Sequence, residues 1–221
     1  DGTPRAYMVS VAPMPGSQGG AFATHTDITT RKVMERQMAH QAHHDPLTGL
    51  RTRRRVEQDL EPSLARSVAT GRPLGAVIVD LDRFKAVNDS MGHGVGDELL
   101  RIVAARLENA CRASDVVGRF GGDEFVVICK GLTKHETVEK VAAAMHDTFA
   151  RPVTIGGSEL LTGSSIGVTS AGRGDDRSAA ELLRDADTAM YAAKNERSGV
   201  RIFDEHHRRA VVERMGVERE L

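Results

Sequence analysis

The chain has 221 residues, a length that suits one domain of about 150–170 residues with flanking segments. Its hydrophobic content of 40% and charged content of 28% are those of an ordinary globular protein, and its net charge of −1 provides no general basic field for nucleic acid. No apolar run approaches the roughly 20 residues that a membrane helix needs, and no signal peptide opens the chain. These features exclude a nucleic-acid-coating protein and a membrane segment in this fragment.

The two cysteines, Cys111 and Cys129, both fall in apolar segments, so we expect reduced thiols in the core of a cytoplasmic protein. The chain starts at Asp1 rather than at Met and ends at Leu221 inside a helical pattern. Both features predict a piece of a longer protein. A membrane attachment elsewhere in that parent protein is compatible with this interpretation.

Residues 1–29 are predicted to form two short strands joined by a loop rich in Pro, Gly and Ser. The strand candidates are 5–11 and 20–26, and Asp27-Ile28-Thr29 follows the second. This pattern resembles the last hairpin of a PAS sensor domain and the exit that often precedes an output domain. Two strands cannot bury a core alone, so this fragment is expected to hold no sensing pocket.

A helix is predicted over 30–44, with an apolar stripe formed by Val33, Met34, Met38 and Ala42. In a fused signalling protein such a helix pairs with its twin and transmits a signal. Packing on its own domain is an equal alternative, because the stripe is too short to establish a coiled coil.

A second helix is predicted over 51–70, where Asp45 and Thr48 can cap and brace its start. A buried strand then ends at Asp80, and Leu81 and Asp82 follow it. The next helix begins at 83–85, and its free N–H groups suit a triphosphate. An amphipathic helix is predicted over 95–111.

Gly121 and Gly122 lie between a short strand at 115–120 and an apolar run at 126–129, which predicts a hairpin with Asp123 and Glu124 at its tip. On its own this sequence is more typical of a solvated acidic hairpin. The acidic end of the earlier strand favours another interpretation, because two strands that bring carboxylates to one sheet end can hold metal ions for phosphoryl or nucleotidyl transfer.

The remaining predicted elements are a helix at 133–150, paired strands at 153–155 and 160–169 around two glycines, a helix at 178–195, a strand at 200–203 and a charged helix at 204–221. The elements follow the order βαββαβ with additions. This order predicts an α+β fold, in which helices flank an antiparallel sheet of the polymerase-palm or nucleotidyl-cyclase type.

Three motifs, Asp80–Lys85, Asn88–His93 and Gly121–Phe125, together resemble the GGDEF family of diguanylate cyclases, and the likeness covers roughly residues 40–205. We therefore divide the chain into a PAS-like end (1–29), a signalling helix (30–44), a GGDEF domain (45–205) and a linker helix (206–221). The last segment resembles the linker into an EAL phosphodiesterase domain, which is expected to follow in the parent protein.

The resemblance implies roles for particular residues. The metal ligands would be Asp80, the Leu81 carbonyl, Asp123 and Glu124, and one of the last two would accept a proton. The residues that bind GTP would be Phe84, Lys85, Asn88, His93, Asp97, Lys194 and Arg197. Arg112 and Asp115 would form an inhibitory site for the product. The sequence departs from the family pattern at Thr52, where Asn is usual, and at Arg197, which stands one position before the expected arginine.

The resemblance implies condensation of two GTP molecules into cyclic di-GMP and two pyrophosphates, with two Mg²⁺ ions, or Mn²⁺ instead, per active site. Because the product has two-fold symmetry, catalysis would need a homodimer. Three alternatives stay open. The domain could bind GTP or cyclic di-GMP only to regulate an attached phosphodiesterase, it could use another nucleotide on the same fold, or this fragment could be an inactive monomer.

Overall fold

The computed structural model describes residues 5–13, 21–34, 43–133 and 137–203. The chain divides into two compact units, 1–43 and 44–221, and each is described by itself. Residues 29–34 are helical, in agreement with the start of the expected signalling helix. The rest of that helix, at 35–42, and the predicted helix at 204–221 lie outside the described residues.

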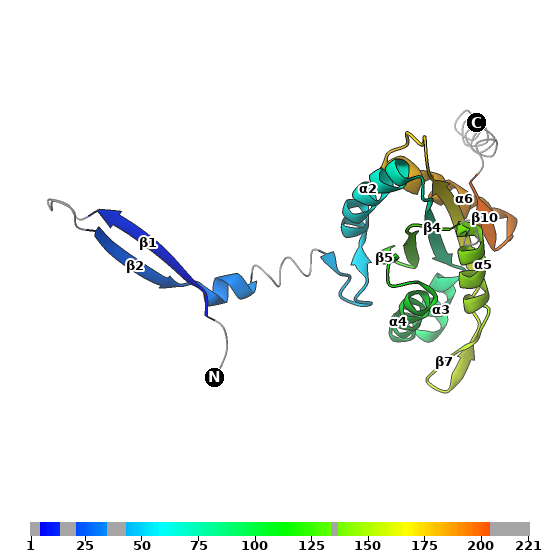
Figure 1. Ribbon diagram of the computed structural model, residues 1–221. Coiled ribbons are helices and arrows are strands. Elements are labelled where there is room, and N and C mark those ends of the chain that lie inside the picture. The colour runs from blue at the N-terminus through cyan, green and yellow to red at the C-terminus, as the bar shows by residue number, and fades with distance from the viewer. Residues whose placement is uncertain (1–4, 14–20, 35–42, 134–136, 204–221) are drawn as a thin grey trace, which may run out of the picture. The chain divides into compact units, whose positions relative to one another are not determined.

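The first unit contains an antiparallel hairpin of β1 (Tyr7–Pro13) and β2 (Ala21–Asp27), shown in Figure 1. The hairpin is closed after β2, where the amide of Ile28 donates to the Ala6 carbonyl at 2.9 Å. The amide of Thr29 donates to the Asp27 carboxylate at 2.9 Å, a local turn that short acidic side chains favour. The strands expected from the sequence are therefore present.

The second unit is built on a six-stranded sheet in the order β10-β9-β4-β6-β5-β3 (Figure 1). Its strands are β3 (Arg51–Thr52), β4 (Leu74–Leu81), β5 (Val116–Gly121), β6 (Glu124–Cys129), β9 (Ser164–Ala171) and β10 (Val200–Ile202). The central strand β4 is antiparallel to both neighbours, whereas β3 and β10 pair in parallel at the edges. The predicted α+β fold with a central antiparallel sheet is confirmed.

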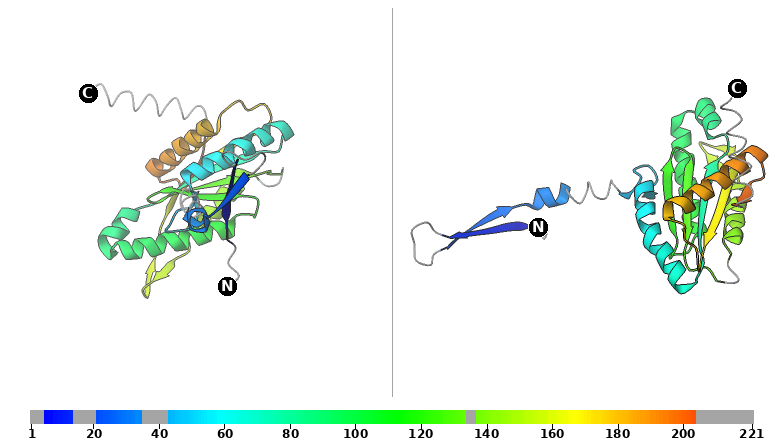
Figure 2. Two further views of the ribbon diagram at one scale, coloured as in Figure 1. Left: turned by 90° about the vertical axis from the view of Figure 1, so that its left-hand side faces the viewer. Right: turned by 90° about the horizontal axis from the view of Figure 1, so that it is seen from above.

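Helices cover both faces of this sheet (Figure 2). They are α2 (Arg53–Thr70), α3 (Phe84–Met91), α4 (His93–Ala110), α5 (Val138–Phe149) and α6 (Ala179–Glu196). Because side chains of a strand alternate between faces, Val77 and Val79 of β4 join the core with α4 and α5, whereas Ala76 and Ile78 join the core with α2 and α6. The sequence of a strand that is buried on both faces is a continuous apolar run, as that of β4 is before Asp80.

The prediction of one continuous strand over 160–169 is wrong, because strand structure ends at Leu160 and resumes only after Gly163. The glycines 156 and 157 have φ of 58° and 83° and turn a small separate hairpin of β7 (Val153–Ile155) and β8 (Ser158–Leu160). At Gly163 the carbonyl accepts from the Asp82 amide at 3.0 Å, and a Cβ would lie 2.5 Å from Asp82 Oδ2. The close contact at Gly163 brings the chain alongside the end of β4, and β9 starts at Ser164, paired with Leu81.

The ends of several helices also differ from prediction. Residues 51–52 pair with β5 as strand β3, so α2 starts two positions later than expected. Helix α4 starts at His93 and α5 at Val138, where the Thr137 side chain accepts from the Lys140 amide. The shifts of α2 and α5 follow from strand pairing and capping, which helical periodicity does not report.

Helix α6 lies directly on β9 because of Gly167. A Cβ at this position would lie 2.0 Å from the Ala186 carbonyl oxygen and 2.1 Å from the Met190 amide nitrogen. No side chain fits in that space, so the helix backbone approaches the strand closely. This approach sets the position of Lys194, about one turn beyond Met190 along the helix.

Both cysteines are free thiols, as expected. Burial raises the pKa of Cys111 to about 12 and raises the pKa of Cys129 further. At pH 8 a thiol with a pKa of 12 is a thiolate in only about one molecule in ten thousand, and the thiolate is the reactive form. We expect iodoacetamide to alkylate the folded protein more than about a hundredfold more slowly than free cysteine, as measured by mass spectrometry. Urea-unfolded protein should label fully, and labelling of Cys111 at the free rate in the folded protein would contradict this prediction.

Candidate functional site

The acidic ends of β4 and β6 meet at one edge of the sheet. Asp80 is the register partner of Glu124, and the Leu81 amide donates to the Asp123 carbonyl at 3.3 Å. Gly121 and Gly122 both have positive φ, 144° and 53°, and form the turn between β5 and β6. The prediction that these two acidic segments lie together is therefore confirmed.

Lys194 of α6 reaches this edge and binds Asp80. Its Nζ donates to both carboxylate oxygens, at 2.7 and 2.9 Å. Asp80 is 4% exposed, and burial raises the pKa of its carboxyl despite the bonds from Lys194. Burial alone would lower the pKa of Lys194, but the hydrogen bonds and the negative charge of Asp80 outweigh burial, so the pKa of Lys194 is raised. The lysine is therefore cationic at neutral pH, and Asp80 gains from any further cation placed beside it.

Glu124 lies among other carboxylates, so negative charge accumulates around it. Burial raises the pKa of its carboxyl, and the charges of Asp187, Asp80 and Asp123 raise it further. Asp187 of α6 lines the same cavity as Asp80, Glu124 and Lys194, of about 390 Å³, although it is not among the site residues that the sequence predicts. One lysine does not balance these carboxylates, and hard divalent cations prefer such oxygen donors.

The donor set therefore fits a divalent metal ion, although the side chains are not gathered around one. Within the described ranges, no three His, Cys, Asp or Glu side chains stand together as metal ligands. Lys194 holds both oxygens of Asp80 instead. Metal binding at Asp80 would use the lone pairs of these oxygens that Lys194 does not occupy, or would displace the lysine.

The helices α3 and α4 bring the predicted guanine-binding residues together. A Cβ at Gly96 would lie 2.0 Å from the Asn88 side-chain oxygen and 3.2 Å from the Phe84 ring, so α4 packs tightly on α3 at this point. Asn88 thus lies beside the residue that precedes Asp97, whose side chain is exposed. Lys85 and His93 are exposed on the same two helices. The pair of Asn88 and Asp97 can offer both donors and acceptors to a base.

A cavity of about 490 Å³ lies next to Lys194, between the end of β4, the start of β9 and the end of α6. Arg197 lines it and ends α6 in the left-handed conformation, with φ of 52°, which glycine usually adopts there. Arg83 also lines it, and it caps α3 with φ of 59°. Sequence patterns gave no signal for Arg83, because only the backbone geometry turns it toward this cavity. We name this space the cationic cavity.

Arg112 and Asp115 form a compact turn before β5. The Asp115 carboxylate accepts from the backbone amides of Arg112 at 3.0 Å and Lys130 at 3.1 Å, and its side chain is 2% exposed. The Arg112 guanidinium lies 3.3 Å from the same carboxylate and is 38% exposed. The turn borders a groove of about 1040 Å³ whose other lining cations are Arg66, Arg72 and Lys130. The structure therefore brings this predicted pair together, with Asp115 buried and Arg112 accessible.

Arg119 of β5 links the turn between β5 and β6 to the segment that precedes β3. Its guanidinium donates to the Gly122 carbonyl at 2.7 and 3.1 Å and to the Asp45 carboxylate at 2.9 Å. Asp45 also accepts from the Thr48 amide and hydroxyl, so the two residues brace the turn before β3. The segment 44–50 and the acidic hairpin are thus joined through one side chain. The expectation that Asp45 and Thr48 cap the following helix is wrong, because α2 starts only at Arg53 and has Thr52 at its N-cap position.

We expect Arg119→Ala to lower the free energy of unfolding by about 1–3 kcal/mol, because it removes charge-assisted hydrogen bonds from a side chain that is 11% exposed. Urea denaturation at pH 7 measures the change. Arg54→Ala on the exposed face of α2 is the matched control and should change stability by less than about 0.5 kcal/mol. Equal midpoints for the two variants would contradict the prediction.

Comparison with known proteins agrees with this geometry. Residues 42–199 match the family model described as "Diguanylate cyclase, GGDEF domain". The chain is 39% identical over 170 residues to diguanylate cyclase DgcM of Escherichia coli K12, which covers 77% of this chain and 40% of DgcM. It is 37% identical over 197 residues to an uncharacterized signaling protein of Caulobacter vibrioides, covering 88% of this chain and 24% of that protein. The chain thus spans between a quarter and two fifths of these curated relatives.

Solved structures show the same fold. The isolated GGDEF domain of TpbB from Pseudomonas aeruginosa superposes with a TM-score of 0.71 at 34% identity, covering 76% of this chain and 99% of that one. The coiled coil and GGDEF domain of DgcB from Caulobacter crescentus, solved in complex with c-di-GMP, superposes with a TM-score of 0.66 at 25% identity, covering 78% and 91%. In the described part of this chain, no helix is both long and apolar enough to cross a membrane.

Proposed function

The chain belongs to the GGDEF family of diguanylate cyclases, and on this basis we propose that its second unit condenses two GTP molecules into cyclic di-GMP and two pyrophosphates. The observation that carries the proposal is the meeting of Asp80 with the Asp123–Glu124 tip beside Lys194. Nucleotidyl transfer needs such a site, where carboxylates hold cations against phosphate groups.

Asp80, Asp123 and Glu124, with the Leu81 carbonyl, are the residues that would hold the metal ions, Mg²⁺ or in its place Mn²⁺, two in each site. Bound there, the ions would acidify the attacking 3′-hydroxyl and neutralise charge on the leaving pyrophosphate. Asp123 or Glu124 accepts the proton from the hydroxyl. Lys194 leaves Asp80 and pairs with the triphosphate.

The triphosphate lies across the start of α3 and the cationic cavity. The free amides at the first turn of α3, at Phe84 and Lys85, suit an anion, and the Lys85 side chain adds a positive charge. Arg197 is carried to the opposite side of the cavity by the end of α6. These groups orient the nucleotide so that its reacting phosphate faces the acidic edge.

Asn88 and Asp97 recognise the guanine base, and His93, at the start of α4, lies between them in the chain. A carboxylate accepts from the N1–H and the exocyclic amine of guanine, whereas adenine offers no donor at its N1 position. GTP is therefore the preferred substrate. Because GTP is a cytoplasmic nucleotide, the proposed reaction places this domain in the cytoplasm.

Two copies of the domain must face one another during the reaction. Each holds one GTP, and each 3′-hydroxyl attacks the nucleotide held by the other copy, which gives a product with two-fold symmetry. Cyclic di-GMP then binds at Arg112 and inhibits the enzyme. We further propose that the β1–β2 hairpin is the end of a PAS sensor domain, and that an EAL domain follows in the parent protein.

The experiment that tests the reaction is incubation of the chain with GTP and Mg²⁺, followed by chromatography of the nucleotides. Formation of cyclic di-GMP, with a rate that rises more steeply than protein concentration, supports the cyclase and its dimer. ATP in place of GTP should give no cyclic product. GTP binding without product at any protein concentration would favour the regulatory binding module instead.

A further inference from the structure

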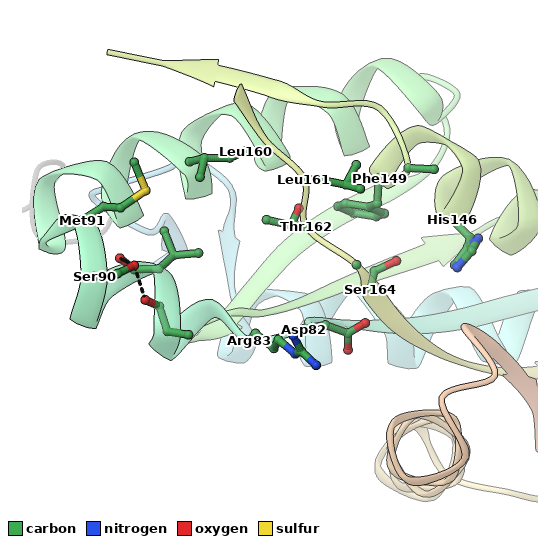
Figure 3. Close-up of a pocket in the computed structure, with 14 residues that line it drawn as sticks. Asp82, Arg83, Ser90, Met91, His146, Phe149, Leu160, Leu161, Thr162 and Ser164 are labelled. Atoms are coloured by element: carbon green, nitrogen blue, oxygen red, sulfur yellow. Dashed lines mark hydrogen bonds between the residues drawn. The ribbon is translucent and has the colours of Figure 1, made fainter. Parts of the chain in front are cut away.

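A chamber of about 560 Å³ adjoins the cationic cavity and shares a wall with it (Figure 3). The shared wall consists of Asp82, Arg83, His146, Gly163 and Ser164. Beyond this wall the chamber extends between α3, the end of α5 and the β8–β9 connection. None of the residues to which the family resemblance assigns a role lines the chamber, so its use is not explained by the proposed reaction.

The end of the chamber at the shared wall is polar and rich in hydrogen-bond donors. Ser164 is 2% exposed, and its hydroxyl has no hydrogen-bond partner among the described residues. A buried hydroxyl in this state is rare in proteins, and a rotation about χ1 would offer it to an occupant. Around the two cavities the cationic groups are Arg83, Arg197 and Lys194, against the single carboxylate of Asp82.

The Asp82 carboxylate keeps its negative charge but already has a hydrogen-bond donor. Its Oδ1 accepts from the Ser165 hydroxyl at 2.7 Å. Lys194 is held by Asp80, but no described residue pairs with the guanidinium groups of Arg83 and Arg197. Around the shared wall, the guanidinium groups of Arg83 in the wall and Arg197 in the adjoining cationic cavity outnumber the one carboxylate of Asp82, so the net charge there is positive and suits an anionic group.

The other end of the chamber is apolar. Figure 3 shows Met91 and Leu160 at the end away from His146, with Leu161 and Phe149 between. Leu161 is 72% exposed and Met91 is 37% exposed, so the chamber wall carries apolar surface that faces water. An apolar body placed there removes that surface from water, which is favourable.

We infer that the chamber binds a small amphipathic anion, whose carboxylate or phosphate head lies at Ser164 and Arg83 and whose apolar body lies against Leu161 and Met91. We further infer that the head competes with the terminal phosphate of GTP at the shared wall. The competition rests on the proposed function, whereas the binding of the anion does not.

Calorimetric titration of the nucleotide-free chain with hexanoate, octanoate and decanoate tests the binding. Each added methylene should tighten binding about fourfold, because burial of a methylene has a roughly constant favourable free energy. Decanol, which has no charge, should bind at least about tenfold more weakly than decanoate. Decyl phosphate distinguishes the two head groups by its affinity relative to decanoate. Affinity that does not depend on chain length, or equal binding of decanol, would overturn the inference.

Two variants of residues that line the chamber test whether decanoate binds there. Ala86 lines it from an exposed position on α3, so Ala86→Phe should fill it and weaken decanoate binding more than about tenfold. Ser164→Ala should weaken binding about fivefold through loss of one hydrogen bond. Asp89→Ala, on α3 but outside the chamber, is the matched control and should bind like the unaltered chain. Equal affinities for the Ala86→Phe and Asp89→Ala variants would show that decanoate binds elsewhere.

The competition is measured as the dissociation constant of GTP with and without saturating decanoate. We expect decanoate to raise this constant more than about fivefold, and the Ala86→Phe variant to lose the effect. GTP binding that is unchanged by bound decanoate would overturn the competition. If the chain binds decanoate but no GTP, the proposed function fails and the chamber assignment stands, so the two failures are distinguishable.

Discussion

Asp80→Asn is expected to lower the rate of cyclic di-GMP formation by at least about a thousandfold. The substitution keeps the size of the side chain but removes the charge that would hold a metal ion between β4 and β6. Metal polarisation of a phosphoryl oxygen lowers the activation barrier by several kcal/mol, and each 1.4 kcal/mol corresponds to a factor of ten in rate. Chromatography of the products from GTP at saturating Mg²⁺ measures the loss.

The same variant should stay folded. Because burial raises the pKa of the Asp80 carboxyl in the folded state, the ionised form favours folding less than the protonated form does. The contribution of this group to stability is complete at low pH and is lost as the pH rises through its folded pKa. A neutral side chain avoids that loss, although it also gives up the ion pair with Lys194, so the midpoint of urea denaturation at pH 7 should change little.

Asp89→Asn supplies the control for this experiment. It makes the same chemical change at an exposed position of α3 that lines none of the cavities described above. We expect its rate to lie within a factor of two of the unaltered chain. If Asp80→Asn kept more than a tenth of the activity while folded, the assignment of Asp80 as a metal ligand would be wrong.

Local sequence patterns predict most of the strands and the turns between them. The apolar run that ends at Asp80 and the turn at Gly121 and Gly122 each predict a strand end, and the register of β4 with β6 places those ends together. Such patterns work because a strand buried on both faces must be apolar throughout, and a tight hairpin needs residues that accept positive φ.

Contacts between distant segments could not be read in the same way. The break before β9 depends on Gly163 fitting against Asp82, and the ion pair of Lys194 with Asp80 joins residues that are 114 positions apart. Arg83 is turned by a left-handed backbone, which its side-chain type does not indicate. These features arise from tertiary packing, and no local periodicity encodes them.

Electrostatic state is likewise a property of the assembled site. The sequence shows that Glu124 is acidic, but the rise in its pKa comes from burial and from Asp187 on a helix 63 positions away in the chain. Asp115 shows the reverse case, because the pattern of Arg112 and Asp115 predicts two ligand-binding side chains. In the structure one of the two is already committed to backbone amides. Function at that turn must therefore be tested at the arginine.

We expect Arg112→Ala to raise the inhibition constant of cyclic di-GMP by about 30- to 150-fold. The exposed guanidinium can turn from Asp115 toward a phosphate or guanine edge, and the charge-assisted hydrogen bonds that it would make are worth about 2–3 kcal/mol. The initial rate without product should be unchanged, since the turn lies at the start of β5 and the acidic tip lies at its other end. Initial rates with increasing amounts of added product measure the constant.

Asp115→Ala separates regulation from folding. This substitution removes the acceptor for two backbone amides, so it should lower the free energy of unfolding by about 1–3 kcal/mol as well as weaken inhibition. Arg101→Ala, which alters an exposed arginine on α4, is the control and should change neither property. Because Arg112→Ala leaves those amides paired to Asp115 and removes only the half-exposed guanidinium, it should weaken inhibition by the factor given above with a smaller loss of stability than Asp115→Ala. An unchanged inhibition constant in a folded Arg112→Ala variant would mean that the product acts at another surface.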